Sequence, residues 1–174
     1  IAAVAHRSGV TSLVARAAAR GPRRVPILTY HRVNDDRDPY FPSMPTAVFE
    51  RQMAYVARAY RVLPLEEMVE RLQRDDVPSN AAAITFDDGY EDAHRYALPV
   101  LERVGVPATF FLTVGLTEGN PDTAAKMARL QGSSLEDVAG LTWEQVVEMR
   151  DAGMAFGCHG VNHLNLAQAD DGVV

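Results

Sequence analysis

Short apolar runs alternate with amphipathic segments along most of this chain, and this order restricts the possible fold more than any other feature. We expect four strands in the apolar, β-branched runs at 25–30, 81–86, 106–114 and 154–158. We expect helices between them at 46–60, 64–74, 91–104 and 142–153. Strands that alternate with helices build parallel sheets or barrels of βα units. The sequence therefore predicts an α/β protein.

Bulk composition narrows the classes of function. A chain of 174 residues suits a single domain, which we place at 25–174 after a basic helix at 1–24. The net charge of −6 argues against a nucleic-acid partner, because phosphate binding usually needs a basic face. No run approaches the ~18 apolar residues that read as a membrane span. The single cysteine, Cys158, excludes an internal disulfide.

Two adjacent carboxylates, Asp87 and Asp88, directly follow the run at 81–86 and precede Gly89. Neighbouring strand residues point to opposite faces, so the two carboxylates can serve different partners. Capping of the next helix would need only one of them. Carboxylates at the end of a strand are candidates for metal binding and for proton transfer.

Histidines follow two other predicted strands: His31 comes after the first, and His159 and His163 come after the last. The carboxyl ends of parallel strands meet at one edge, so we expect these residues near the acidic pair. Either histidine alone reads best as a hydrogen-bonded loop residue. Two histidines with one carboxylate, however, are an ordinary ligand set for a catalytic metal.

Several motifs in order resemble the polysaccharide deacetylase family, which is the NodB-homology domain of carbohydrate esterase family 4. The main motifs are Thr85-Phe86-Asp87-Asp88-Gly89-Tyr90 and His159-x-x-x-His163. Supporting motifs lie at 28–33, 49–53, 106–111 and 141–144. The resemblance covers about residues 25–170 and is closest in style to bacterial deacetylases of poly-β-1,6-N-acetylglucosamine.

The resemblance implies a distorted (β/α)7 barrel and a hydrolase that removes N-acetyl groups from a glycan containing N-acetylglucosamine. It implies that Asp87 is the general base. It also implies that Asp88, His159 and His163 hold the metal, which is usually zinc. A glycan partner of this class suits an extracellular or cell-envelope location.

Two further residues are candidates for the substrate pocket. His31 follows the first strand, where it would line the pocket or make a structural hydrogen bond. Tyr90 ends the acidic motif, and we expect it at the rim of the pocket.

The chain departs from the family pattern in three ways. Gly160 stands where the family usually has a hydroxyl residue, for which Asn162 is a candidate replacement, and Leu164 stands where it has proline. The family's later motifs, including a leucine-histidine segment that carries the general acid, do not occur before Val174. We therefore expect an incomplete barrel and a piece of a longer protein.

Two alternatives to the deacetylase remain. One is a degenerate homologue that binds carbohydrate or has a structural role without turnover. The other is a hydrolase of the same fold that acts on an amide outside sugars.

Overall fold

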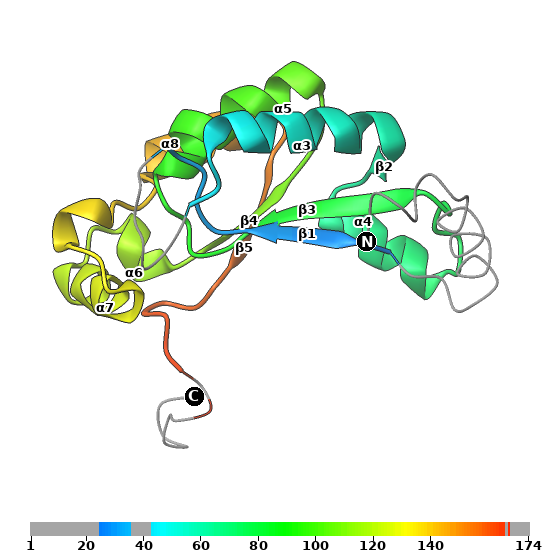
Figure 1. Cartoon of the computed structure of the whole chain (residues 1–174). Helices are drawn as coiled ribbons and strands as arrows, with labels where there is room; N and C mark the ends of the chain where they lie inside the picture. The colour runs from blue at the N-terminus through cyan, green and yellow to red at the C-terminus, as the bar shows by residue number, and fades with distance from the viewer. Residues whose placement is uncertain (1–24, 36–42, 166, 168–174) are drawn as a thin grey trace, which may run out of the picture.

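The computed structural model describes residues 25–35, 43–165 and 167, and a parallel sheet forms its centre (Figure 1). The strands are β1 (Ile27–Tyr30), β2 (Arg61–Val62), β3 (Ala81–Phe86), β4 (Thr109–Leu112) and β5 (Ala155–Cys158). The strand order is β1-β3-β4-β5, β2 pairs with the start of β3, and every pairing is parallel. The predicted α/β class is confirmed. The basic helix expected at 1–24 lies outside the described residues.

Helices cover both faces of this sheet. The α-helices are α3 (Thr46–Ala59), α4 (Leu65–Gln73), α5 (Leu98–Val104), α6 (Val114–Thr117), α7 (Pro121–Gln131) and α8 (Trp143–Asp151). Two short helices of other types are η1 (Ala93–Ala97) and η2 (Leu135–Asp137). In Figure 1, α3, α5 and α8 lie over one face of the sheet and α4 lies on the other. None of the helices in the described part of the chain has the length and apolarity that a membrane crossing requires.

The central strand β3 is buried along its whole length. Ala81 and Ala83 pack with Met68 of α4, whereas Ile84 and Phe86 belong to the larger core on the opposite face. A strand covered on both faces needs apolar residues at every position rather than at alternate ones. This requirement explains the continuous apolar run that precedes the acidic pair.

A row of aromatic rings crosses the sheet from edge to edge. Tyr30, Phe86, Phe110 and Phe156 are direct partners in the register of β1, β3, β4 and β5. Successive ring centroids lie 5.4, 4.6 and 5.7 Å apart. Aromatic pairs at such distances contribute about 0.5–1.5 kcal/mol beyond the area that they bury. The row therefore favours one register for all four strands.

The structure differs from the predicted elements in three places. The helix expected at 91–104 is present, but its first part is the π-helix η1, which runs directly into α5 with Pro99 near the start of α5. Proline lacks the N–H that a continuous helix would use and crowds the preceding turn. The region at 115–141, for which the sequence predicts a loop with one or two short helices, contains the 11-residue α7, whose N-cap Asn120 accepts bonds from two backbone N–H groups. Strand β2 was not expected; its two residues pair with the first two of β3.

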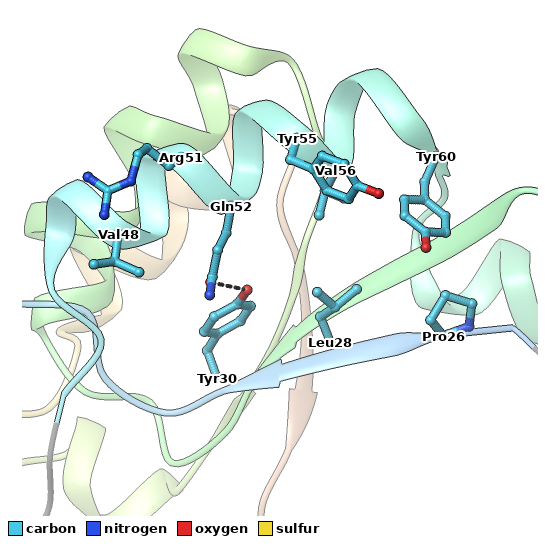
Figure 2. A pocket seen from close by; sticks show the side chains of 9 residues that line it. All are labelled: Pro26, Leu28, Tyr30, Val48, Arg51, Gln52, Tyr55, Val56 and Tyr60. Atoms are coloured by element: carbon cyan, nitrogen blue, oxygen red, sulfur yellow. Dashed lines mark hydrogen bonds between the residues drawn. The ribbon is translucent and has the colours of Figure 1, made fainter. Parts of the chain in front are cut away.

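The sheet of the described residues is open, with β1 and β5 at its edges. A cavity of about 430 Å³ lies beside β1, under α3 (Figure 2). Its lining includes Tyr30, Tyr55 and Tyr60, and the Tyr30 hydroxyl donates a hydrogen bond to Gln52 Oε1 at 2.9 Å. None of the residues that line this cavity belongs to the predicted metal site.

Truncation of Phe110, one of the two inner rings of the aromatic row, should destabilise the whole sheet. Phe110 is fully buried, and Phe110→Ala should lower the free energy of unfolding by about 3–5 kcal/mol in a urea titration. Phe111→Ala is the matched control, because Phe111 is the next residue on the same strand and is only partly buried. Equal losses for the two variants would contradict the role given to the row.

Candidate metal centre

The chain turns sharply where β3 ends, through Asp88 and Gly89. Both residues have positive φ angles, 73° at Asp88 and 79° at Gly89. Glycine adopts such angles freely, and a Cβ atom at position 89 would lie 2.9 Å from Leu112 Cδ2. Asp88 has a side chain, and the left-handed conformation costs a residue with a Cβ atom about 1–2 kcal/mol. The turn therefore holds Asp88 in an unfavourable backbone conformation.

Backbone hydrogen bonds bring the ends of three strands to the same level. The N–H of Thr113, just after β4, donates to the carbonyl of Asp88 at 3.2 Å. The N–H of His159, just after β5, donates to the carbonyl of Leu112 at 2.8 Å. The residues that follow β3 and β5 thus lie together at the carboxyl end of the sheet, although β4 separates these strands.

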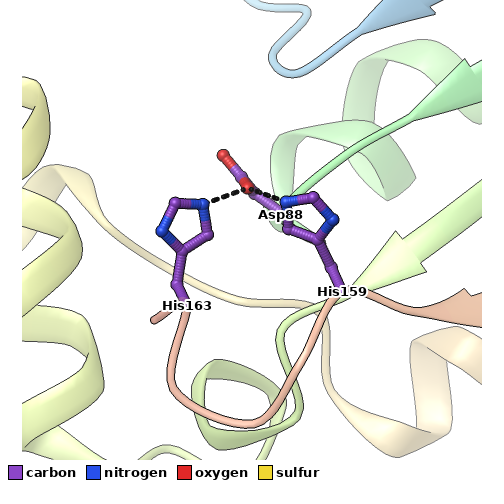
Figure 3. Close-up of side chains that lie close together, drawn as sticks. All are labelled: Asp88, His159 and His163. Carbon is purple, nitrogen blue, oxygen red and sulfur yellow. Dashed lines mark ion pairs between the residues drawn. The ribbon is translucent and has the colours of Figure 1, made fainter. Parts of the chain in front are cut away.

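Asp88, His159 and His163 converge at this end of the sheet (Figure 3). The Nε2 atoms of His159 and His163 lie 3.3 and 3.1 Å from the same oxygen, Asp88 Oδ1. The two imidazole rings are 5.3 Å apart between centroids. The structure therefore brings together the three residues for which the sequence predicts a shared metal.

The environment of Asp88 fits a cation. Its side chain is 6% exposed, and Oδ1 has no hydrogen-bond partner of good geometry among the described residues. A buried acceptor left unsatisfied costs about 1–3 kcal/mol, and more when it is charged. Two imidazole nitrogens and a carboxylate oxygen match the protein ligands of catalytic zinc sites, which keep one position open. These three residues could hold a divalent metal ion.

Two further site candidates, Asp87 and His31, follow the ends of the paired strands β3 and β1, where the Asp87 N–H donates to the carbonyl of Tyr30 at 2.9 Å. Asp87 adjoins Asp88 in the chain, is partly exposed and is not one of the three converging residues. His31 is exposed and lies directly after β1. Their roles as base and as pocket residue stay predictions.

The expectation that Tyr90 lies at the rim of the pocket is wrong. Tyr90 is 1% exposed and is buried in a cluster with Leu116 and Met127. Burial, and then the charge of Asp88 and its hydrogen bond with the phenol, raise the pKa of Tyr90 above its usual range. Tyr90 therefore supports the Asp88 carboxylate from inside the protein as a neutral phenol.

A buried ion pair behind Tyr90 escaped the sequence analysis. Arg32 Nε lies 2.7 Å from Asp92 Oδ2, and Asn34 Nδ2 donates to the same oxygen at 2.8 Å. The Arg32 guanidinium also lies over the Tyr90 ring, 5.1 Å from its centroid. A usable signal was present, since Arg32 follows His31 and Asp92 is the fourth acidic residue after β3. The pair ties the end of β1 to the segment that carries Tyr90.

The loop at 159–163 departs from the family pattern for a backbone reason. Gly160 has a φ angle of 85°, which disfavours the hydroxyl residues of the family. Asn162, considered as a replacement for that hydroxyl, uses its side-chain oxygen to accept a bond from Thr123. Cys158 Sγ accepts a bond from the Gly160 N–H at 3.3 Å. A hollow of about 830 Å³ lined by residues 158–164 borders the loop, a size that suits a small ligand.

Comparison with known proteins identifies the family of this chain. The family model for polysaccharide deacetylases matches residues 74–172. YxkH of Bacillus subtilis, provisionally named a polysaccharide deacetylase, is 31% identical over 147 residues, which are 83% of this chain and 45% of YxkH. The poly-beta-1,6-N-acetyl-D-glucosamine N-deacetylase of Escherichia coli K12 is 26% identical over 125 residues, 70% of this chain and 18% of that protein.

A solved structure agrees with these matches. The deacetylase PplD of Streptococcus pyogenes, in complex with acetate, superposes with a TM-score of 0.70 and 28% identity over 88% of this chain and 63% of PplD. The chain thus spans less than half of either curated relative. Fold, motifs and family model agree, and the expected fold is confirmed: this chain belongs to the polysaccharide deacetylase family and has its NodB-type parallel α/β fold.

Proposed function

We propose that this chain belongs to a zinc-dependent hydrolase that removes N-acetyl groups from a polysaccharide containing N-acetylglucosamine. The observation that carries the proposal is the convergence of two imidazole nitrogens on the buried Asp88 Oδ1. Membership of the family and the name of the Escherichia coli relative support the substrate class. The acetate bound to PplD is the small product that such a reaction releases.

Asp88, His159 and His163 would hold the zinc ion through one oxygen and two nitrogens. When bound, zinc supplies a lowered pKa for water and a positive charge that polarises the amide carbonyl. The turn at Asp88 and Gly89 keeps the carboxylate directed at the two imidazoles. Tyr90 is buried and stays a neutral phenol, because burial and the charge of Asp88 raise its pKa.

Asp87 would act as the general base. It is the residue next to a ligand, and it is outside the converging group, so its carboxylate stays available to take a proton from the attacking water. The water oxygen adds to the amide carbon, the C–N bond breaks as the leaving nitrogen gains the proton that Asp87 took from the water, and acetic acid, which ionises to acetate, and a free amine result. His31, exposed after β1, would line the pocket. A surface polymer as substrate favours an extracellular or cell-envelope location.

The proposed division of labour between the two aspartates predicts different metal contents. Asp88→Asn and His163→Ala should weaken zinc binding by more than the ~10–100-fold that loss of a supporting residue costs. Asp87→Asn should retain zinc, because its carboxylate is not a ligand in this scheme. Elemental analysis of the purified variants measures the difference. Equal loss of zinc in all three variants would contradict it.

Acetate release tests the reaction itself. The full-length, zinc-loaded protein should release acetate from N-acetylglucosamine oligomers, and Asp87→Asn should slow this release by about 10²–10⁴-fold. A zinc-loaded protein that binds the oligomers without turnover would instead support the carbohydrate-binding alternative. Turnover restricted to amides outside sugars would support the third reading.

A further inference from the structure

The loop that carries His159 and His163 is held to α6 through its backbone. The N–H of Val114 donates to the carbonyl of Gly160 at 3.1 Å, and the N–H of Gly115 donates to the carbonyl of Val161 at 2.8 Å. These two bonds fix the middle of the loop. Neither bond involves His163, which lies at the far end of the loop.

Side chains of α7 hold the residue just before His163. Thr123 Oγ1 donates to Asn162 Oδ1 at 2.8 Å, and Lys126 Nζ donates to the carbonyl of Asn162 at 3.0 Å. Thr123 is 2% exposed, so its hydrogen bond is shielded from water. The partners Thr123 and Asn162 are 39 positions apart in the chain. We call Gly115, Thr123, Lys126 and Asn162 the loop clamp.

Gly115 makes this close approach possible. A Cβ atom there would lie 2.6 Å from Thr123 Oγ1, 2.8 Å from the carbonyl oxygen of Val161 and 2.9 Å from Asn162 Oδ1. Real side chains essentially never approach so closely, so any side chain at position 115 would force the loop away from α6 and α7. The absence of a side chain at Gly115 is thus part of how the loop is seated.

His163 needs such support because its own backbone is unfavourable. Its φ angle is 49°, one of three positive values at residues other than glycine in the described part of the chain. Residues held in this region persist only where the surroundings determine them. The bonds to Asn162, the preceding residue, are the ones that can hold His163 in this conformation.

We propose that Thr123 and Asn162 are positioning residues for the metal site and act through His163. They keep the His163 Nε2 atom directed at Asp88 Oδ1, and neither belongs to the converging group itself. This inference rests on the proposed metal site. It also supplies an anchor for a loop in which Gly160 has no hydroxyl group.

Removal of one hydroxyl tests the clamp. In Thr123→Val the side chain keeps its shape and loses its bond to Asn162, and the zinc dissociation constant should rise by about 10–100-fold in competition with a chelating dye. Thr123→Ser, which keeps the hydroxyl, should restore the affinity. Thr117→Val is the matched control, because the Thr117 hydroxyl is buried on the neighbouring α6 and has no hydrogen-bond partner among the described residues. It should bind zinc as the unsubstituted protein does.

Hydrogen exchange on the zinc-free protein gives a second readout. Backbone amides at 159–163 should exchange faster in Thr123→Val than in Thr117→Val, with unchanged melting temperatures in both. Asn162→Ala removes the same hydrogen bond at its exposed partner, Asn162. It should show both effects as well, so the test remains valid if Thr123→Val does not fold.

The outcomes separate the clamp from the metal site. Unchanged zinc affinity and unchanged exchange in both Thr123→Val and Asn162→Ala would overturn the clamp. Failure of the unsubstituted protein to bind zinc would overturn the proposed metal site, while exchange in the zinc-free variants would still decide whether the clamp holds the loop.

Discussion

The row of aromatic rings across the sheet is the interaction on which the site depends. Tyr30, Phe86, Phe110 and Phe156 pair in register, so the sheet aligns its strands close to their carboxyl ends. Asp88 follows Phe86 by two residues and His159 follows Phe156 by three. A shift of one residue in a strand reverses which side chains face the core. The packing that stabilises the sheet thus also sets where the ligands meet.

Two buried aspartates, Asp92 and Asp88, have different kinds of partner. Asp92 has a protein cation, Arg32, and a second donor in Asn34. Asp88 has the Tyr90 phenol on one side and two imidazoles on the other. A buried ion pair is costly to break because one charge is left uncompensated. Asp92 thus has a permanent partner within the protein, whereas Asp88 faces the two imidazoles of the proposed metal site.

The parts that the sequence predicts are those encoded by neighbouring residues. The apolar run at 81–86 indicates a buried strand, and polar residues just after it are placed at its end by geometry alone. Pairings between distant residues leave no such local signal. Thr123 and Asn162 look like ordinary polar residues until α7 and the loop are packed together. Tyr90 looks exposed because it comes soon after two acids, but apolar residues of α6 and α7 pack around it.

The backbone angles of Asp88 and His163 limit how this protein can be stabilised. Both lie in the left-handed region, where glycine or asparagine would be less strained. Such replacements would relieve backbone strain, yet here each would remove a charge or an imidazole that faces the proposed ion. Selection for a more robust fold would therefore work against the site at these two positions. Gains in robustness must come from elsewhere in the molecule, such as exposed positions of the outer helices.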